Sequence, residues 1–176
     1  SPKPLTGLSL EKTRSMNDNL RRLGMTTMAF AAGDKELRGP LHMGLPTVET
    51  SRGTGVLFSM LQLIKDCHTD ICLVGDIDIS DEAWRGVKEL SEGYVSLKAE
   101  IDPEYRFITD EIHHDRPDSS EYVIRSQESR AYASQGKLFP AQSVKPRGRG
   151  SISVGNEGYL RYSGELEIAR RDLEPE

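Results

Sequence analysis

The chain has 176 residues, of which 36% are apolar and 29% charged, and its formal net charge is -5. This is the composition of an ordinary globular protein with room for one large domain or two small ones. The charges are spread evenly, with 11 basic and 13 acidic side chains in residues 1–92 and 12 and 15 in residues 93–176, so the chain gives no electrostatic case for a nucleic-acid or membrane partner.

The first predicted element is a helix that begins after Ser9. Serine is a favoured N-cap, and apolar residues follow at helical spacing until Gly24, a residue type that often lies just past a helix end. The apolar positions are Met16, Leu20 and Leu23. Residues 26–30 are then predicted to form a short strand that closes on a Gly-Asp pair.

A second helix is predicted over residues 54–65, after a loop rich in glycine and proline. It is apolar over most of its circumference, so we expect it to be well covered. Residues 71–74 form a continuous apolar run, which is typical of a parallel strand buried on both faces, and the run stops at Gly75-Asp76. Ser80 then begins a third helix with acidic residues in its first turn. The buried stripe of that helix is predicted to be Ala83, Val87 and Leu90.

This alternation of helices and strands is typical of a parallel α/β sheet or barrel. Two clear strands cannot close a barrel, so either further strands precede Ser1 or the sheet is small and open. The chain opens on Ser1-Pro2 without an initiator methionine. We therefore expect a fragment of a longer protein.

From Gly93 the pattern changes to short alternating segments, which predict strands. These segments are residues 95–101, 105–109, 121–126, 151–154 and 164–168. Turn signals such as Asp102-Pro103 separate them. Five or more short strands without a convincing helix predict a small closed or sandwiched β module. The expected domains are residues 1–92 and 93–176.

Three acidic residues in the first domain are candidate catalytic groups. Asp34 and Asp76 each follow a glycine at the carboxyl end of a strand, the edge where parallel α/β folds bind ligands. The alternative is that each aspartate caps the following turn. Glu49 could pair with an aspartate as general acid and base, as glycoside hydrolysis requires. A solvated glutamate before the next helix is the other interpretation.

Basic residues in both domains are candidate anion ligands. Arg38, beside Gly39-Pro40, could hold a phosphate or carboxylate with two hydrogen bonds, although surface arginines are common and that interpretation is favoured. In the second domain the candidates are His114, Arg116, Arg125 and Arg130. Neighbouring histidines on a strand point to opposite faces, so His113 and His114 do not predict a metal site. The basic run at 145–149 is predicted to be a solvated loop.

Other function classes leave no signal in the sequence. There is no Walker loop, dinucleotide fingerprint, paired Cys-x-x-Cys motif or nucleophile elbow, so no cofactor is expected. No apolar run approaches the ~20 residues of a membrane-spanning helix. The chain has two cysteines, Cys67 and Cys72, which predicts a reduced, cytoplasmic setting.

Several short motifs, in this order, resemble the later barrel part of the MupG family, the 6-phospho-N-acetylmuramidases of the outer surface protein type. In the first domain these are residues 3–9, 38–41, 44–49 and 74–76 with Ser80. The second domain is similar to the family's C-terminal domain at residues 114–119, 123–126, 129–130, 149–152 and 161–166. The resemblance covers almost the entire chain.

The resemblance implies the C-terminal part of a TIM-type (β/α) barrel in residues 1–92, followed by an all-β cyclophilin-like domain in residues 93–176. It also implies hydrolysis of the bond between 6-phospho-N-acetylmuramic acid and N-acetylglucosamine during peptidoglycan recycling. The substrate would be a phosphorylated amino-sugar disaccharide, and the oligomeric state stays open. On this hypothesis Asp76 and Glu49, with Asp34 third, are the catalytic carboxylates, and the basic residues hold the phosphate or lactyl carboxylate.

One position departs from the family pattern. The family often carries a glutamate directly before Gly44-Leu45-Pro46, and this chain has Met43 there. The alternative function is therefore a sugar-phosphate-binding or interaction protein that keeps the scaffold without catalysis.

Overall fold

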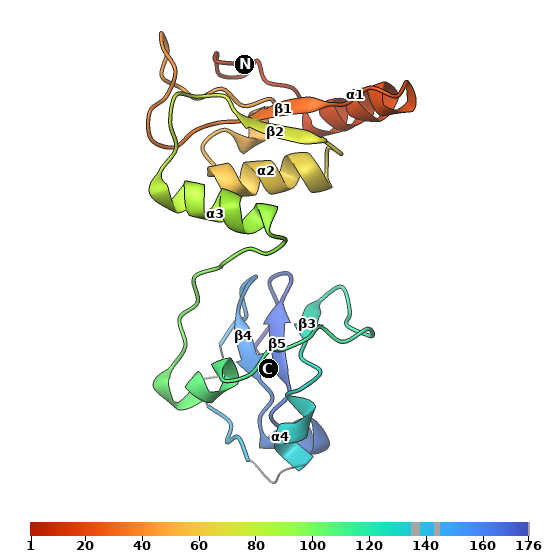
Figure 1. Cartoon of the computed structure of the whole chain (residues 1–176). Coiled ribbons are helices and arrows are strands. Elements are labelled where there is room, and N and C mark those ends of the chain that lie inside the picture. The colour runs from red at the N-terminus through yellow and green to blue at the C-terminus, as the bar shows by residue number, and fades with distance from the viewer. Residues whose placement is uncertain (135–137, 143–144, 176) are drawn as a thin grey trace. The chain divides into compact units, whose positions relative to one another are not determined.

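The computed structural model describes residues 1–134, 138–142 and 145–175 and divides into two compact units (Figure 1). Unit 1 is Ser1–Ala99 and unit 2 is Glu100–Glu176. In the residues described, no helix is both long enough and apolar enough to cross a lipid bilayer.

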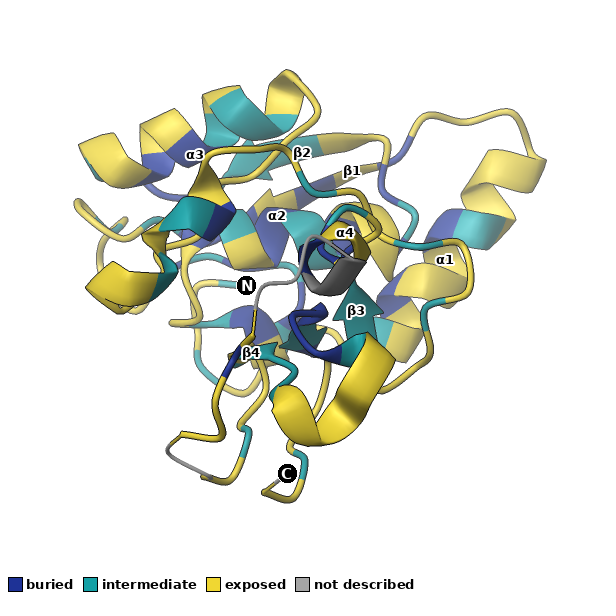
Figure 2. Ribbon diagram, turned by 90° about the horizontal axis from the view of Figure 1, so that it is seen from below, coloured by how far each residue is buried: buried dark blue, intermediate teal, exposed yellow. Residues whose placement is uncertain are grey.

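Helix α1, Leu10–Arg22, begins where predicted: the Ser9 hydroxyl accepts a hydrogen bond from the Lys12 amide at 3.1 Å. It ends where predicted too, because Gly24 follows the C-cap with a φ of 75°. Its buried positions, however, are Thr13 and Asn17, and most of the helix is exposed (Figure 2). The periodic apolar residues that predicted it are exposed: Met16, Leu20 and Leu23.

The sheet of unit 1 pairs β1, Met28–Ala31, in parallel with β2, Ile71–Val74. The predicted strand at 71–74 is confirmed. The strand predicted at 26–30 is found at 28–31, so it begins two residues later and ends one residue later than predicted. The expectation that β2 is buried on both faces is wrong, because Ile71 is 42% exposed and the rest of β2 is only half-buried. Helix α2 covers one face of these strands (Figure 1). No closed barrel is formed by the described residues.

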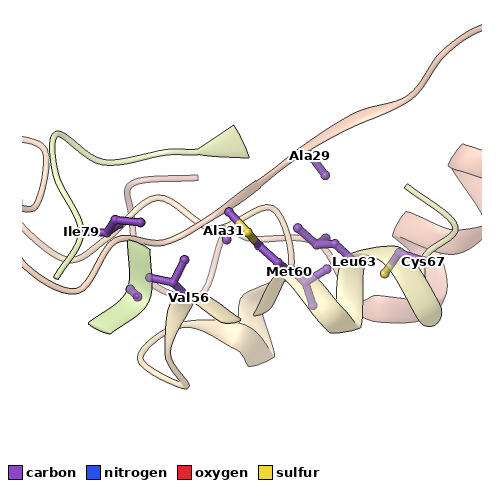
Figure 3. Packing of buried hydrophobic residues seen from close by; sticks show 9 residues of the cluster. Ala29, Ala31, Val56, Met60, Leu63, Cys67 and Ile79 are labelled. Atoms are coloured by element: carbon purple, nitrogen blue, oxygen red, sulfur yellow. The ribbon is translucent and has the colours of Figure 1, made fainter. Parts of the chain in front are cut away.

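Helix α2, Val56–Lys65, starts two residues later than predicted, after a short 3₁₀ helix at Glu49–Ser51. The expectation that α2 is well covered holds only in part, because Phe58 is 52% and Ile64 40% exposed while most of the helix is buried or half-buried. Its buried face and β1 form the core of unit 1 (Figure 3). The core includes Ala29, Ala31, Val48, Val56, Met60, Leu63, Cys67, Ile79 and Ala83.

Helix α3, Asp81–Ser91, follows the predicted N-cap, since the Ser80 hydroxyl accepts from the Ala83 amide at 3.1 Å. Ala83 is buried, and Val87 and Leu90 pack half-buried against the core, as predicted. The serine cap and the acidic first turn therefore identified the start of this helix, and the spacing of its apolar residues identified its buried face.

Unit 2 contains a three-stranded antiparallel sheet in the order β3-β5-β4. The strands are β3, Val123–Arg125, β4, Ile152–Val154, and β5, Leu166–Ala169. They lie at or within three of the five predicted segments, although β5 extends one residue further. Unit 2 also has helix α4, Arg130–Ser134, and 3₁₀ helices at Pro103–Thr109 and Glu157–Tyr162, so the expectation of a helix-free β module is wrong.

Two strands predicted for residues 93–176 are not strands. Residues 95–101 form no regular element, and Leu97 in that segment is 83% exposed. Residues 105–109 lie in the 3₁₀ helix that begins at Pro103, where the fixed φ of proline suits a helix start. The aromatic side chains there face the core, where the rings of Phe107 and Tyr132 meet edge to face at 5.5 Å. The apolar residues that suggested an alternating strand are therefore core residues of a 3₁₀ helix.

Candidate functional site

Asp76 follows β2 after a single residue, Gly75, and its carboxylate accepts hydrogen bonds from three backbone N–H groups. Oδ2 accepts from Gly33 at 2.7 Å and from Leu45 at 3.0 Å, and Oδ1 accepts from Arg38 at 2.9 Å. The residue is 7% exposed. Burial is the largest influence and by itself raises the pKa, but the three amides outweigh it, and the pKa of Asp76 lies below its ordinary value. Asp76 is therefore ionised and joins three loop positions.

Glycines make this close approach possible. A Cβ on Gly33 would lie 2.8 Å from the Cβ of Asp76, and a Cβ on Gly75 would lie 2.3 Å from the carbonyl oxygen of Leu45. A side chain at either position would push the loops apart. The repeated Gly-Asp pattern therefore has a packing role at both positions.

Arg38 contributes to this cluster in two ways. Its amide binds Asp76, and its guanidinium charge helps to lower the Asp76 pKa. The guanidinium itself is exposed and makes no hydrogen bond or ion pair to any residue in the described part of the chain. The guanidinium is therefore available to bind an anion near Asp76, at the carboxyl end of β2.

Both carboxylate oxygens of Glu49 accept hydrogen bonds from donors within the chain. Oε1 accepts from the Leu5 amide and from Arg52 Nε, each at 2.8 Å, and Oε2 accepts from the Gly7 amide at 2.7 Å and Arg52 Nη2 at 2.9 Å. The Arg52 hydrogen bond is the main cause that lowers the pKa of Glu49 to about 2, and the two amides add to it. Glu49 is consequently ionised at neutral pH, and it holds residues 5–7 in place.

Arg52 connects Glu49 to the loop that contacts Asp76. Its Nη1 donates to the carbonyl oxygens of Met43 at 2.9 Å and Gly44 at 2.8 Å. The next residue, Leu45, donates its amide to Asp76. The negative charge of Asp76 also raises the pKa of Arg52, after the larger contribution of Glu49. The structure thus places Asp76 and Glu49, the two leading candidate carboxylates, in one hydrogen-bonded network, and the pKa of each is lowered.

Asp34 has a local structural partner. Its Oδ1 accepts from the Ser80 amide at 2.7 Å and its Oδ2 from the Ser80 hydroxyl at 2.8 Å. That hydroxyl caps α3. Asp34 therefore ties the turn after β1 to the start of α3, and a capping role accounts for its contacts.

The predicted anion ligands of unit 2 fall into three groups. His114 is exposed and bound to Glu128 through Nδ1 at 2.8 Å, and its backbone and side-chain hydrogen bonds lower the pKa of Glu128 to about 2. Arg130 is exposed at the start of α4 and makes no hydrogen bond or ion pair to a described residue. Arg116 and Arg125 share one carboxylate, which the sequence analysis did not identify.

That carboxylate is Glu165, which is 6% exposed. Oε1 accepts from Arg116 Nη1 and from Arg125 Nη2, each at 2.7 Å, and Oε2 accepts from Arg125 Nη2 at 2.9 Å. Asp118 binds the other side of the Arg116 guanidinium. These arginines therefore join segments that lie 40 or more residues apart in the sequence. Glu165 lies in the 161–166 motif of the family resemblance, but no sequence pattern connected it with Arg116 or Arg125.

The basic run at 145–149 is also more ordered than predicted. Arg147 pairs with Leu173 through two backbone hydrogen bonds, of 3.0 and 2.8 Å. Its side chain is 19% exposed, and Nη1 lies 3.7 Å from Glu167 Oε2. The expectation of a solvated loop is wrong at Arg147, because the pairing with Leu173 holds it against β5.

The comparisons with known proteins agree along the whole chain. The family profile "6-phospho-N-acetylmuramidase, N-terminal" matches residues 1–89, and "6-phospho-N-acetylmuramidase, C-terminal" matches residues 94–176. None of the curated proteins is significantly similar to the chain.

Two solved structures resemble the chain over its full length. A conserved protein of unknown function from Enterococcus faecalis is 27% identical, with a TM-score of 0.82, over 100% of this chain and 48% of that one. An uncharacterized B. cereus protein is 23% identical, with a TM-score of 0.73, over 100% of this chain and 52% of that one, and shows likeness of fold alone. The chain thus spans about half the length of either structure. Since the two profiles follow each other in order and together cover nearly every residue, the chain belongs to the 6-phospho-N-acetylmuramidase family.

Proposed function

We propose that this chain forms part of a glycoside hydrolase that cleaves 6-phospho-N-acetylmuramic acid from N-acetylglucosamine during peptidoglycan recycling. The observation that carries the proposal is the match to both family profiles in sequence order. The parallel β1–β2 pair fits the C-terminal part of a TIM-type barrel in residues 1–92, and the antiparallel sheet of unit 2 fits a cyclophilin-like domain in residues 93–176. Free Cys67 and Cys72 fit a cytoplasmic reaction.

The contacts of the two main carboxylates support different roles. Asp76, with its lowered pKa, suits an ionised nucleophile, base or electrostatic group and does not suit a general acid, which needs a raised pKa. Glu49, with a pKa of about 2 and four donors, suits a positioning role. The general acid of the proposed reaction is then a different group.

Substrate binding in the proposal begins with Arg38. Its guanidinium is exposed beside Asp76 and can give a phosphate or lactyl carboxylate two charge-assisted hydrogen bonds. His114 and Arg130 are further proposed ligands. Arg116 and Arg125 contribute through their shared Glu165 by shaping unit 2.

The test is cleavage of the phosphorylated disaccharide by the intact native protein and its Asp76→Asn variant. We expect the variant to lose about 100-fold or more in turnover, the typical contribution of a catalytic carboxylate. Asp66→Asn removes a charge from the exposed end of α2 and should keep wild-type turnover. Circular dichroism checks that each variant is folded. Wild-type turnover by a folded Asp76→Asn variant would contradict the role of Asp76.

A second candidate function is sugar-phosphate binding without catalysis. The specific observation in its favour is that internal donors already engage all four oxygens of Glu49 and Asp76. Met43, in place of the family's frequent glutamate, points the same way. Saturable binding of the disaccharide without release of sugar supports this second function. A protein that neither binds nor cleaves the disaccharide would contradict both functions.

A further inference from the structure

Unit 2 contains a cavity of about 390 Å³ that none of the residues discussed as substrate ligands lines. Its size falls within the ~300–1,000 Å³ typical of small-molecule sites. Apolar and aromatic side chains from three segments form part of its wall. These are Tyr105, Ile108, Phe139 and Val154. Such a wall is suited to a ring-shaped ligand.

Polar groups that β4 and its flanking residues place in the wall have hydrogen-bonding capacity to spare. Ser151 and Ser153 line the cavity, and their hydroxyls make no hydrogen bond to any residue described. Asn156 uses its side-chain oxygen to accept from the Gly158 amide at 2.8 Å, which leaves its amide N–H groups for a ligand. Two hydroxyls and an amide are suited to the hydroxyl groups of a sugar.

The charged groups of the lining lie in two segments of the chain. Lys145 and Arg147 provide two cations, and Glu100 and Asp102 provide two carboxylates. The backbone of Arg147 pairs with Leu173. Its guanidinium is held by Glu167, whose Oε2 lies 3.7 Å from Nη1, and by the Glu174 carbonyl oxygen, which accepts from Nε at 3.5 Å. Arg147 also lines a neighbouring cavity of about 90 Å³. A held guanidinium binds an anion at a lower entropic cost than a mobile one. The carboxylates can accept hydrogen bonds from sugar hydroxyls.

We propose that this cavity binds an anionic monosaccharide. The phosphate or carboxylate of the ligand contacts Lys145 and Arg147, its ring packs on the Tyr105 and Phe139 wall, and its hydroxyls bind Ser153 and Asn156. Every residue of this site belongs to unit 2, so the proposal does not depend on the proposed glycosidase activity and would stand or fall without it.

The experiment is isothermal titration of the whole chain with glucose 6-phosphate, glucuronate, glucose and inorganic phosphate. We expect saturable binding of glucose 6-phosphate or glucuronate, with glucose and inorganic phosphate about tenfold weaker or more, because each has only one of the two recognised features. Preference between the two anions identifies phosphate or carboxylate as the natural group. The proposal is overturned if neither anion binds at concentrations up to about 10 mM, because even weak specific ligands bind more tightly than that.

Matched variants locate the site. Arg147→Gln and Lys145→Ala should each weaken binding about tenfold, the effect of one charge-assisted hydrogen bond. Lys145 is exposed, so its variant keeps the test valid if Arg147→Gln fails to fold. Arg149→Gln removes the same charge two residues away, outside the lining, and should bind normally. Equal weakening by Arg149→Gln, or none by the first two, overturns the proposal.

Discussion

Arg52 grips Glu49 with two parallel hydrogen bonds, Nε to Oε1 at 2.8 Å and Nη2 to Oε2 at 2.9 Å, from one 3₁₀ turn. The same guanidinium also donates to backbone carbonyls in two segments distant in sequence. A planar fork with five donors can do this, whereas a lysine ammonium cannot reproduce the geometry. The Arg52–Glu49 pair therefore holds the loops around Asp76 in place, which is its fastening role.

Replacing Arg52 should loosen unit 1. We expect Arg52→Ala to lower the melting temperature by about 4–8 °C or more, since a loss on the order of 1 kcal/mol has that effect in a unit of this size. Arg52→Lys should recover only part of the loss. Differential scanning calorimetry measures both, and Arg14→Ala, which removes an exposed ion pair with Asp18, should change little. Equal shifts for Arg52→Ala and Arg14→Ala would contradict the fastening role.

The low pKa of Glu49 predicts an acid-dependent loss of stability. A carboxyl whose pKa is lower folded than unfolded stabilises the fold fully above the unfolded pKa, 4.5, and the contribution disappears as the pH falls toward about 2. The free energy of unfolding of the wild type, from urea titrations at several pH values, should therefore fall through this window. Glu49→Gln cannot titrate and should show a shallower fall. Identical slopes for the two proteins would rule out Glu49 as a source.

Gly75 should tolerate no side chain. We expect Gly75→Ala to destabilise unit 1 by about 1–3 kcal/mol, because the new Cβ would lie 2.3 Å from the carbonyl oxygen of Leu45 and would separate the 44–45 loop from β2. Gly148→Ala is the control, since a Cβ there meets nothing closer than 3.8 Å. Chemical denaturation compares them. A Gly75→Ala variant as stable as Gly148→Ala would show that the loop can move away without cost.

Glu165 should be essential to unit 2. Truncation in Glu165→Ala leaves two largely buried arginines without their shared partner, and breaking a buried ion pair typically costs about 3–5 kcal/mol. Hydrogen exchange of the β3 and β5 amides should accelerate in this variant. Glu121→Ala, which removes an exposed partner of Arg171, should leave those amides protected. Unchanged exchange in Glu165→Ala would mean that the sheet is held by other contacts.

Local signals predicted the parts of the fold that local interactions determine. Ser9 and Ser80 were identified as helix caps because capping involves residues three apart. The run at 71–74 was identified as a strand from composition alone. The degree of burial was harder to predict: the exposure of Ile71 depends on which elements cover a sheet face, and no local pattern contains that information.

Contacts between distant residues account for what the sequence analysis missed. Glu165 lies 40 residues from Arg125 and 49 from Arg116, so no spacing rule links them. Asp76 and Glu49 were chosen by position, and the donors that fill their oxygens come from residues up to 44 positions away. The family was identified correctly because motif order does not depend on knowing these contacts.

Position 43 enters the fastening network through its carbonyl oxygen alone, while the Met43 side chain is 50% exposed. Evolution can therefore exchange the residue at this position without rebuilding the loop that carries it. The side chain at this position can therefore change in chemistry while the backbone attachment of the loop to Arg52 is kept.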